Sequence, residues 1–298
     1  MKKIKLIKKK IDNFDMYLDA SGKGISATLN SYGYREPDFM WIMKTEAKGK
    51  LALDIGGNIG YTSLNLSNNV TNVISIEPDP RTRYILKKNV ELNNLQDRIK
   101  ICNFAVSDCN GESTIHLADS PNLSTLCNPI KKDKEKNKYK KIKIRTKTID
   151  SLNIQPSFIK MDIEGYEVEA LLGAMNTLKN AYQCGILIEV HPQYYTKKRN
   201  FELVLRELVL MGYKFKYVLS AGMSQPEAFR LKGYVPFSIF SSPRWQGNYL
   251  ERGLYNSISI EDAIYFCSNL HREYSSVLKK YTDKIVRAIL LERNSEEK

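Results

Sequence analysis

The feature that most constrains this chain is a short apolar stretch, Leu51–Leu53, that runs directly into a glycine-rich turn. Glycines stand at positions 56, 57 and 60, and the pattern then predicts a helix over 61–67. Glycines in such a turn let the backbone approach a ligand closely and let the helix begin tight against the strand. The sequence therefore predicts a strand, turn and helix unit that binds a ligand.

Strand and helix patterns alternate along the chain. We expect further strands over 73–76, 99–104, 157–161, 184–190 and 213–219, and helices over 37–47, 80–92, 168–178 and 201–211. This order predicts an α/β fold with a Rossmann-like, doubly wound and mostly parallel sheet. We expect the catalytic core over 51–220.

Flanking segments are predicted on both sides of that core. Residues 1–50 are interpreted as a lead-in, with short strands over 14–18 and 24–29 before the first helix. Residues 221–298 are interpreted as an aromatic- and arginine-rich segment followed by a C-terminal helix. The expected apolar side of that helix consists of Ile264, Cys267, Tyr274, Leu278, Tyr281 and Ile285.

The formal net charge of +13 is concentrated in two short segments. Residues 2–10 hold six lysines and no acidic residue, and residues 131–147 hold nine lysines and one arginine against two acidic residues. Such runs are usually solvated tails or hairpin tips, so a nucleic-acid partner is possible but not favoured. The oligomeric state is left open.

The composition also indicates a cellular location. No stretch approaches the roughly 18 uncharged apolar residues that a membrane span needs. The N-terminal lysines are not followed by an apolar segment typical of a signal peptide. The five cysteines are scattered, without a C-x-x-C pair, which argues against a disulfide scaffold or a structural zinc site. We therefore expect a cytoplasmic protein.

Polar residues follow the predicted parallel strands, where doubly wound sheets bind ligands. They are Asp54, Glu77, Asn103–Ala105, Asp162–Gly165 and Glu189–His191. An acidic residue at the start of the glycine-rich turn suits a ligand with a cationic amino group better than a pyrophosphate, which favours S-adenosylmethionine. Glu77 can accept hydrogen bonds from two ribose hydroxyls. The alternative is that Asp54 and Glu77 only cap helices.

Five motifs in this order resemble the FkbM family of methyltransferases. Residues 54–61, DIGGNIGY, are similar to the family's D-x-G-A-N-x-G-Y, with Gly57 where alanine is usual. Residues 76–78, IEP, and 103–108, NFAVSD, also fit. Residues 160–167, KMDIEGYE, are similar to K-x-D-x-E-G-x-E, and 188–191, IEVH, to the final E-x-H. The resemblance covers about residues 15–220.

The resemblance implies transfer of a methyl group from S-adenosylmethionine, usually to a hydroxyl group of a sugar, a glycan or a small metabolite. The expected cofactor-binding residues are Asp54, Gly56, Gly57, Asn58, Gly60, Glu77, Pro78, Asn103, Phe104 and Ala105. The expected catalytic residues are Asp162, which would face the methyl group, and Glu164, Glu189 and His191, as bases or as groups that orient the acceptor.

Three alternatives stay open. Asp162, Glu164 and His191 could bind a divalent ion, but no H-x-x-x-H or D-x-D cluster supports this, so we expect no metal. The acceptor could be RNA, although the lysine runs lack the interleaved aromatic residues of a nucleic-acid platform. The chain could also be a non-catalytic subunit that binds the cofactor.

Overall fold

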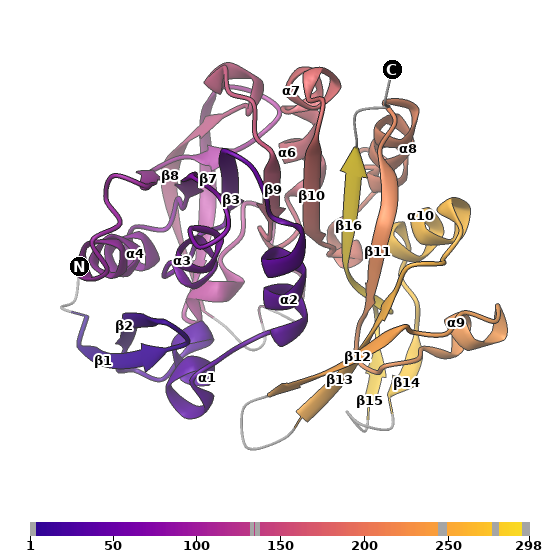
Figure 1. Ribbon diagram of the computed structural model, residues 1–298, viewed down its shortest axis with the longest axis horizontal. Coiled ribbons are helices and arrows are strands. Elements are labelled where there is room, and N and C mark those ends of the chain that lie inside the picture. Colours follow the sequence, from indigo (N-terminus) through magenta and orange to yellow (C-terminus); the bar gives the residue numbers. More distant parts are fainter. Residues whose placement is uncertain (1–3, 132–133, 135–137, 244–248, 276–279, 294–298) are drawn as a thin grey trace.

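The computed structural model describes residues 4–131, 134, 138–243, 249–275 and 280–293. Its main feature is a nine-stranded sheet (Figure 1). In chain order the strands are β3 (Leu51–Ile55), β4 (Asn72–Ile76), β5 (Ile99–Cys102), β9 (Phe158–Met161), β10 (Cys184–Glu189), β11 (Lys214–Ser220), β12 (Ser238–Pro243), β13 (Tyr249–Tyr255) and β16 (Val286–Arg293). Across the sheet they lie in the order β12-β13-β11-β16-β10-β9-β3-β4-β5.

Five neighbouring strands, β5, β4, β3, β9 and β10, are parallel. Their carboxyl ends therefore meet at one edge of the sheet, and there the polar segments predicted from the sequence come together. The prediction of an α/β fold with a mostly parallel sheet is confirmed.

Helices cover both faces of the sheet. One face carries α6 (Glu167–Leu172), α7 (Met175–Asn180), α8 (Phe201–Leu210) and α10 (Ile260–Ser268). The other carries α2 (Pro37–Glu46), α3 (Tyr61–Leu66) and α4 (Pro80–Leu92). Successive side chains of β10 point to opposite faces of the sheet. Ile186 and Ile188 pack in the hydrophobic core on the first face, and Leu187 packs in the core on the second.

The expectation of one C-terminal helix reaching Ile285 is wrong. The helix α10 ends at Ser268, and the chain continues into β14 (Glu273–Ser275), β15 (Lys280–Thr282) and β16; Leu278 lies outside the described residues. The strand β16 is inserted antiparallel between β10 and β11. Its residues 286 and 288–291 are buried, because both faces of this central strand are covered by helices.

The N-terminal lead-in is also more ordered than expected. The strand predicted over 14–18 is β2 (Phe14–Asp19), but it pairs with β1 (Leu6–Ile11), so part of the expected lysine tail is a strand. The strand expected over 24–29 is wrong, because Gly24–Tyr32 form helix α1. Gly33 ends this helix in the left-handed conformation, and its N–H donates to Leu29 O at 2.9 Å.

A three-stranded sheet consists of β6 (Ala105–Val106), β7 (Gly111–Ala118) and β8 (Tyr139–Lys147). The interpretation of 131–147 as a tail or hairpin tip is therefore wrong for β8, whose residues 139–146 pair with β7. Its lysines at 140, 141, 143 and 147 are nevertheless exposed, while Thr146 is buried. Residues 132–133 and 135–137 lie outside the described residues.

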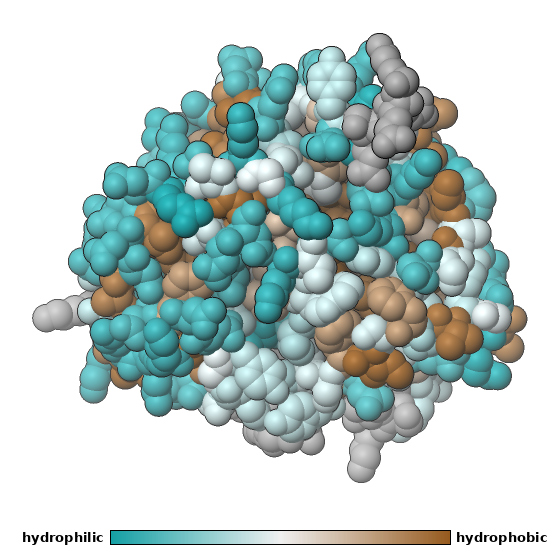
Figure 2. All heavy atoms as spheres, viewed as in Figure 1, coloured by the Kyte–Doolittle hydropathy of each residue, from teal (hydrophilic) through white to brown (hydrophobic). Residues whose placement is uncertain are grey.

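The surface is mostly polar on the face shown in Figure 2, and apolar side chains gather near α9 (Glu227–Leu231) and β12. The exposed apolar residues of this region are Leu231, Val235, Phe237 and Ile239. Within the described residues, no helix has both the length and the apolar character needed to cross a membrane.

Candidate active site

A cavity of about 310 Å³ lies at the carboxyl ends of the parallel strands. Its walls include ten of the predicted cofactor and catalytic residues: Gly56, Gly57, Asn58, Glu77, Pro78, Ala105, Asp162, Glu164, Glu189 and His191. A cavity of this volume can enclose a small-molecule ligand. The structure therefore brings these residues, which are far apart along the chain, around one cavity.

The glycine-rich turn forms one wall of the cavity. The N–H groups of Gly56 and Gly57 both donate to Ile76 O, at 3.0 and 3.2 Å, which ties the turn to the end of β4. Gly56 has a φ of 83°, and a Cβ atom there would lie 2.0 Å from the carbonyl oxygen of Asp162. Only glycine fits at this position, since both the left-handed backbone and the close approach exclude a side chain.

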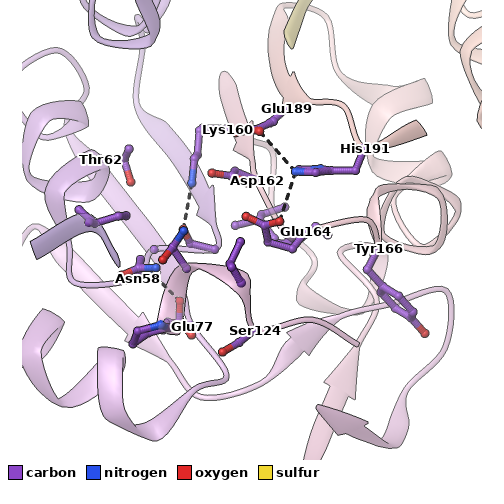
Figure 3. Close-up of a pocket in the computed structure, with 18 of the residues that line it drawn as sticks. Asn58, Thr62, Glu77, Ser124, Lys160, Asp162, Glu164, Tyr166, Glu189 and His191 are labelled. Atoms are coloured by element: carbon purple, nitrogen blue, oxygen red, sulfur yellow. Dashed lines mark hydrogen bonds and ion pairs between the residues drawn. The ribbon is translucent and has the colours of Figure 1, made fainter. Parts of the chain in front are cut away.

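Glu77, directly after β4, lines the same cavity, and Figure 3 shows its carboxylate beside Asn58 of the turn. Its two carboxylate oxygens accept hydrogen bonds from the N–H groups of Asn58 at 2.7 Å and Asp79 at 2.8 Å. Burial and the neighbouring Asp79 carboxylate raise the pKa of Glu77 to about 7. Both oxygens are thus held in fixed directions, and each keeps a lone pair for a further donor.

Asp54 lies behind the cavity wall and does not line it. Its side chain is fully buried, and Oδ2 accepts hydrogen bonds from the hydroxyls of Thr62 at 2.6 Å and Ser63 at 2.5 Å. Lys160 forms an ion pair with Asp54 Oδ1 at 3.1 Å and donates to Gly56 O at 2.9 Å. Asp54 therefore anchors the turn from behind the cavity wall.

Three other predicted cofactor residues lie outside the cavity wall. Gly60, with a φ of 94°, begins helix α3 and does not line the cavity. Asn103 accepts a hydrogen bond from Arg145 of β8 at 3.1 Å, and the Lys147 ammonium lies over the buried Phe104 ring. This segment instead presents Ala105 and Val106 to the cavity.

The catalytic candidates gather around His191 at the ends of β9 and β10. Figure 3 shows its ring between the carboxylates of Glu164 and Glu189, with Asp162 beside it. Nε2 lies 3.5 Å from Glu164 Oε2 and 3.3 Å from Glu189 Oε1. On the other side of the ring, Nδ1 lies 2.9 Å from Oε1 of the fully buried Glu167.

These contacts shift the proton affinities of the cluster. Burial alone would lower the pKa of His191, but the carboxylates of Glu167 and Glu164 outweigh it and raise the pKa to about 10. Burial and neighbouring carboxylates raise the pKa of Glu164 to about 8 and that of Asp162 to about 6. His191 is therefore an imidazolium at neutral pH, which disfavours its expected role as a base.

Glu189 differs from the other carboxylates because two cations contact it. Lys284 Nζ lies 3.3 Å from Glu189 Oε1, and Arg287 binds the same oxygen. Despite burial, these cations hold the pKa of Glu189 well below its usual range. Arg287 also binds Glu36, which forms an ion pair with Arg35 at 2.9 Å.

Sequence reasoning did not assign Arg35, Glu36, Lys284 or Arg287 to the site, although all four line the cavity. The first two lie directly before helix α2, outside the five motifs that carry the resemblance. The other two lie near the end of the segment 221–298, where the sequence predicts a C-terminal helix and the structure has the strand β16.

Backbone strain marks three residues of the cavity wall. Glu36, Asn58 and Glu164 have φ values of 50°, 49° and 51°, in the left-handed region. Asparagine tolerates this region, but glutamate rarely adopts it. Strained residues of this kind cluster at functional sites.

The family model described as the methyltransferase FkbM domain matches residues 54–215. No curated protein sequence matches the chain.

Similar solved structures include the methyltransferase FkbM from Methylobacillus flagellatus, with 18% identity and a TM-score of 0.35; the alignment covers 77% of this chain and 53% of that one. Another is M. jannaschii TYW2 in complex with AdoMet, with 12% identity, coverage of 87% and 89%, and a TM-score of 0.42. A third is precorrin-6y C5,15-methyltransferase from Geobacter metallireducens, with 8% identity, coverage of 87% and 88%, and a TM-score of 0.42. Because the FkbM domain match spans more than half of the chain, this protein belongs to the FkbM methyltransferase family.

Proposed function

We propose that this protein transfers a methyl group from S-adenosylmethionine to a hydroxyl group of a sugar, a glycan or a small metabolite. The observation that carries the proposal is the single cavity that joins the glycine-rich turn and Glu77 to the cluster of Asp162, Glu164 and His191. A methyltransferase needs both parts in one cavity, because the cofactor and the acceptor must be aligned for in-line displacement.

The turn and Glu77 would hold the cofactor. Glu77 already accepts two backbone N–H groups, so its orientation is fixed before the cofactor arrives. The remaining lone pairs suit the two hydroxyls of a ribose. Gly56 and Gly57 let the cofactor approach the backbone, and the ion pair of Asp54 with Lys160 keeps the turn in place.

The cluster at β9 and β10 would act on the acceptor. The acceptor oxygen attacks the methyl carbon, the bond between that carbon and the sulfonium sulfur breaks, and the sulfur keeps the electron pair in S-adenosylhomocysteine. The hydroxyl proton passes to a carboxylate of the cluster, with Asp162 as the first candidate, since its Oδ1 makes no hydrogen bond to any described residue. Glu164, Glu189 and His191 orient the acceptor.

The experiment that tests this function has two steps. Calorimetry with S-adenosylmethionine should show one binding site per chain, and a lack of binding would overturn the cofactor assignment. The protein is then incubated with radiolabelled cofactor and separate pools of glycans, small metabolites and RNA. We expect label in the glycan or metabolite pool; label in RNA alone would overturn the acceptor class, and label in no pool would favour a non-catalytic subunit.

A further inference from the structure

The side chains of Asp162, Glu164 and His191 converge in a way that the proposed methyl transfer does not require. One potential ligand atom from each of the three lies within 4.8 Å of the others. Six-coordinate Mg²⁺ binds at about 2.1 Å, which places its ligands roughly 3 to 4 Å apart. The three residues need only a small contraction to surround such an ion.

His191 is held in the orientation that metal-binding histidines have. Its Nδ1 is paired with Glu167 at 2.9 Å, and both side chains are buried. A carboxylate on one ring nitrogen fixes the tautomer and directs the other nitrogen towards a metal. Here the other nitrogen, Nε2, faces the cavity.

The surroundings of His191 Nε2 are negatively charged and favour a cation. Carboxylate oxygens of Glu164 and Glu189 lie 3.5 and 3.3 Å from it, and an unprotonated Nε2 would place a lone pair against both. Either a proton or a metal ion must lie between these atoms. Lys284 and Arg287 do not neutralise every carboxylate of the cluster. Among the described ion pairs, these two cations contact Glu189 and Glu36 only.

Asp162 provides an independent observation. Its Oδ1 is buried, and within the described part of the chain it has no hydrogen-bond partner. A buried carboxylate oxygen without a partner is costly, so it indicates a group that the protein alone does not supply. The residue lines the cavity beside Glu164 and His191, where a cation would satisfy all three.

We propose that Asp162, Glu164 and His191 bind a divalent cation, with Glu167 as a positioning residue for His191. Two carboxylates and one imidazole suit Mn²⁺ or Mg²⁺, because oxygen ligands predominate and no thiolate takes part. The glycine-rich turn and Glu77 do not take part, so the site would be separate from the cofactor contacts.

The role of the ion, although not its binding, rests on the proposed function. A divalent ion beside the acceptor polarises its hydroxyl group and eases loss of the proton. The expectation from sequence that the protein uses no metal would then be wrong, because ligands from β9 and β10 come together without a compact motif in the chain.

The test uses Mn²⁺ and the full chain, first stripped of metal with a chelator, without cofactor or acceptor. Electron paramagnetic resonance should show one bound Mn²⁺ per chain, and Mg²⁺ should raise the melting temperature. Glu164→Gln should weaken Mn²⁺ binding at least tenfold, and Glu167→Gln should weaken it about 10- to 100-fold, the usual effect of losing a partner of a metal-binding histidine.

Glu207→Gln is the control, since this exposed glutamate on α8 lies outside the cavity wall and should bind Mn²⁺ like the unmodified protein. Circular dichroism confirms that each variant is folded; if Glu164→Gln does not fold, Asp162→Asn replaces it. The absence of Mn²⁺ binding at millimolar concentration, or unchanged binding in the Glu164 or Asp162 variant, would overturn the metal site. Calorimetry with S-adenosylmethionine on the metal-free protein tests the proposed function separately. Cofactor binding without Mn²⁺ binding would overturn only the metal site.

Discussion

The Oγ atom of Ser75 occupies the space that a side chain at Gly57 would need, because a Cβ atom there would lie 2.1 Å from it. Ser75 is fully buried on β4, and its hydroxyl is hydrogen-bonded to Ser63 at 2.8 Å. Ser63 in turn donates to Asp54. The glycine that replaces the family's usual alanine is thus matched to a serine on the neighbouring strand.

Gly57→Ala alone should therefore destabilise this protein, whereas Gly57→Ala combined with Ser75→Ala should be tolerated. We expect the single variant to lower the free energy of unfolding by about 1 to 3 kcal/mol, the usual cost of overpacking. In Gly57→Ala/Ser75→Ala the clash is removed, so a coupling energy of about 0.5 to 3 kcal/mol should appear between the two sites. Urea unfolding of both single variants and the double variant measures it, and strictly additive costs would contradict this account.

The buried ion pair of Lys160 with Asp54 gives a second prediction. Lys160→Met would leave the Asp54 carboxylate without a cation, and breaking a buried pair in this way costs about 3 to 5 kcal/mol of stability. Asp54→Asn/Lys160→Met should be less destabilised, because the charge is removed with its partner. Lys140→Met, at an exposed position of β8, serves as the control in the same unfolding experiment. Equal stability of Lys160→Met and the control would show that the pair contributes nothing.

A third prediction concerns the cofactor. Glu77→Gln keeps the volume of the side chain but removes the charge that strengthens hydrogen bonds to ribose hydroxyls. We expect the binding free energy of S-adenosylmethionine to weaken by about 1.5 to 3 kcal/mol, measured by calorimetry. Asp54→Asn, behind the cavity wall, should act only through the position of the turn. Unchanged affinity in the Glu77 variant would remove the ribose assignment.

The pH dependence of binding follows from the same residue. Burial raises the pKa of Glu77 to about 7, so the carboxylate becomes protonated as the pH falls below that value. If the ionised form binds the ribose, the dissociation constant should rise roughly tenfold between pH 8 and pH 6. Glu77→Gln should show a flatter profile, and this variant also corrects for titration of the cofactor's own amino group. Identical profiles in the two proteins would contradict the prediction.

The strand ends could be predicted from sequence because each motif combines an apolar strand with the polar residue directly after it. Four acidic residues lie at the ends of the predicted strands: Asp54, Glu77, Asp162 and Glu189. All of them except Asp54 line the cavity. Parallel strands place their carboxyl ends together, so local patterns were enough to bring these residues to one edge.

Features that depend on distant pairing could not be predicted in the same way. The strand β16 lies between β10 and β11, and an apolar run of this length fits a helix or a buried strand equally well. Lys284 and Arg287 were missed with it. The burial of Asp54 was missed because its partners come from α3 and β9, which pattern alone does not place behind the turn.

The last prediction concerns the reaction itself. Asp162→Asn preserves the shape of the side chain and should leave cofactor affinity unchanged, while kcat should fall by about 10² or more, the usual scale for loss of a positioned acid–base group. Asp162 is not placed to cap the following helix, because α6 begins at Glu167 and its N-cap residue is Tyr166. The measurement is the initial rate with the acceptor that takes up label, at saturating cofactor, with Glu207→Gln as the control. His191→Gln, measured beside it in the metal-free protein, should lower kcat less, because without a bound ion His191 is protonated at neutral pH and can only orient the acceptor. Turnover at the unmodified rate in both variants would show that neither group takes part and that the transfer depends on alignment of the two substrates alone.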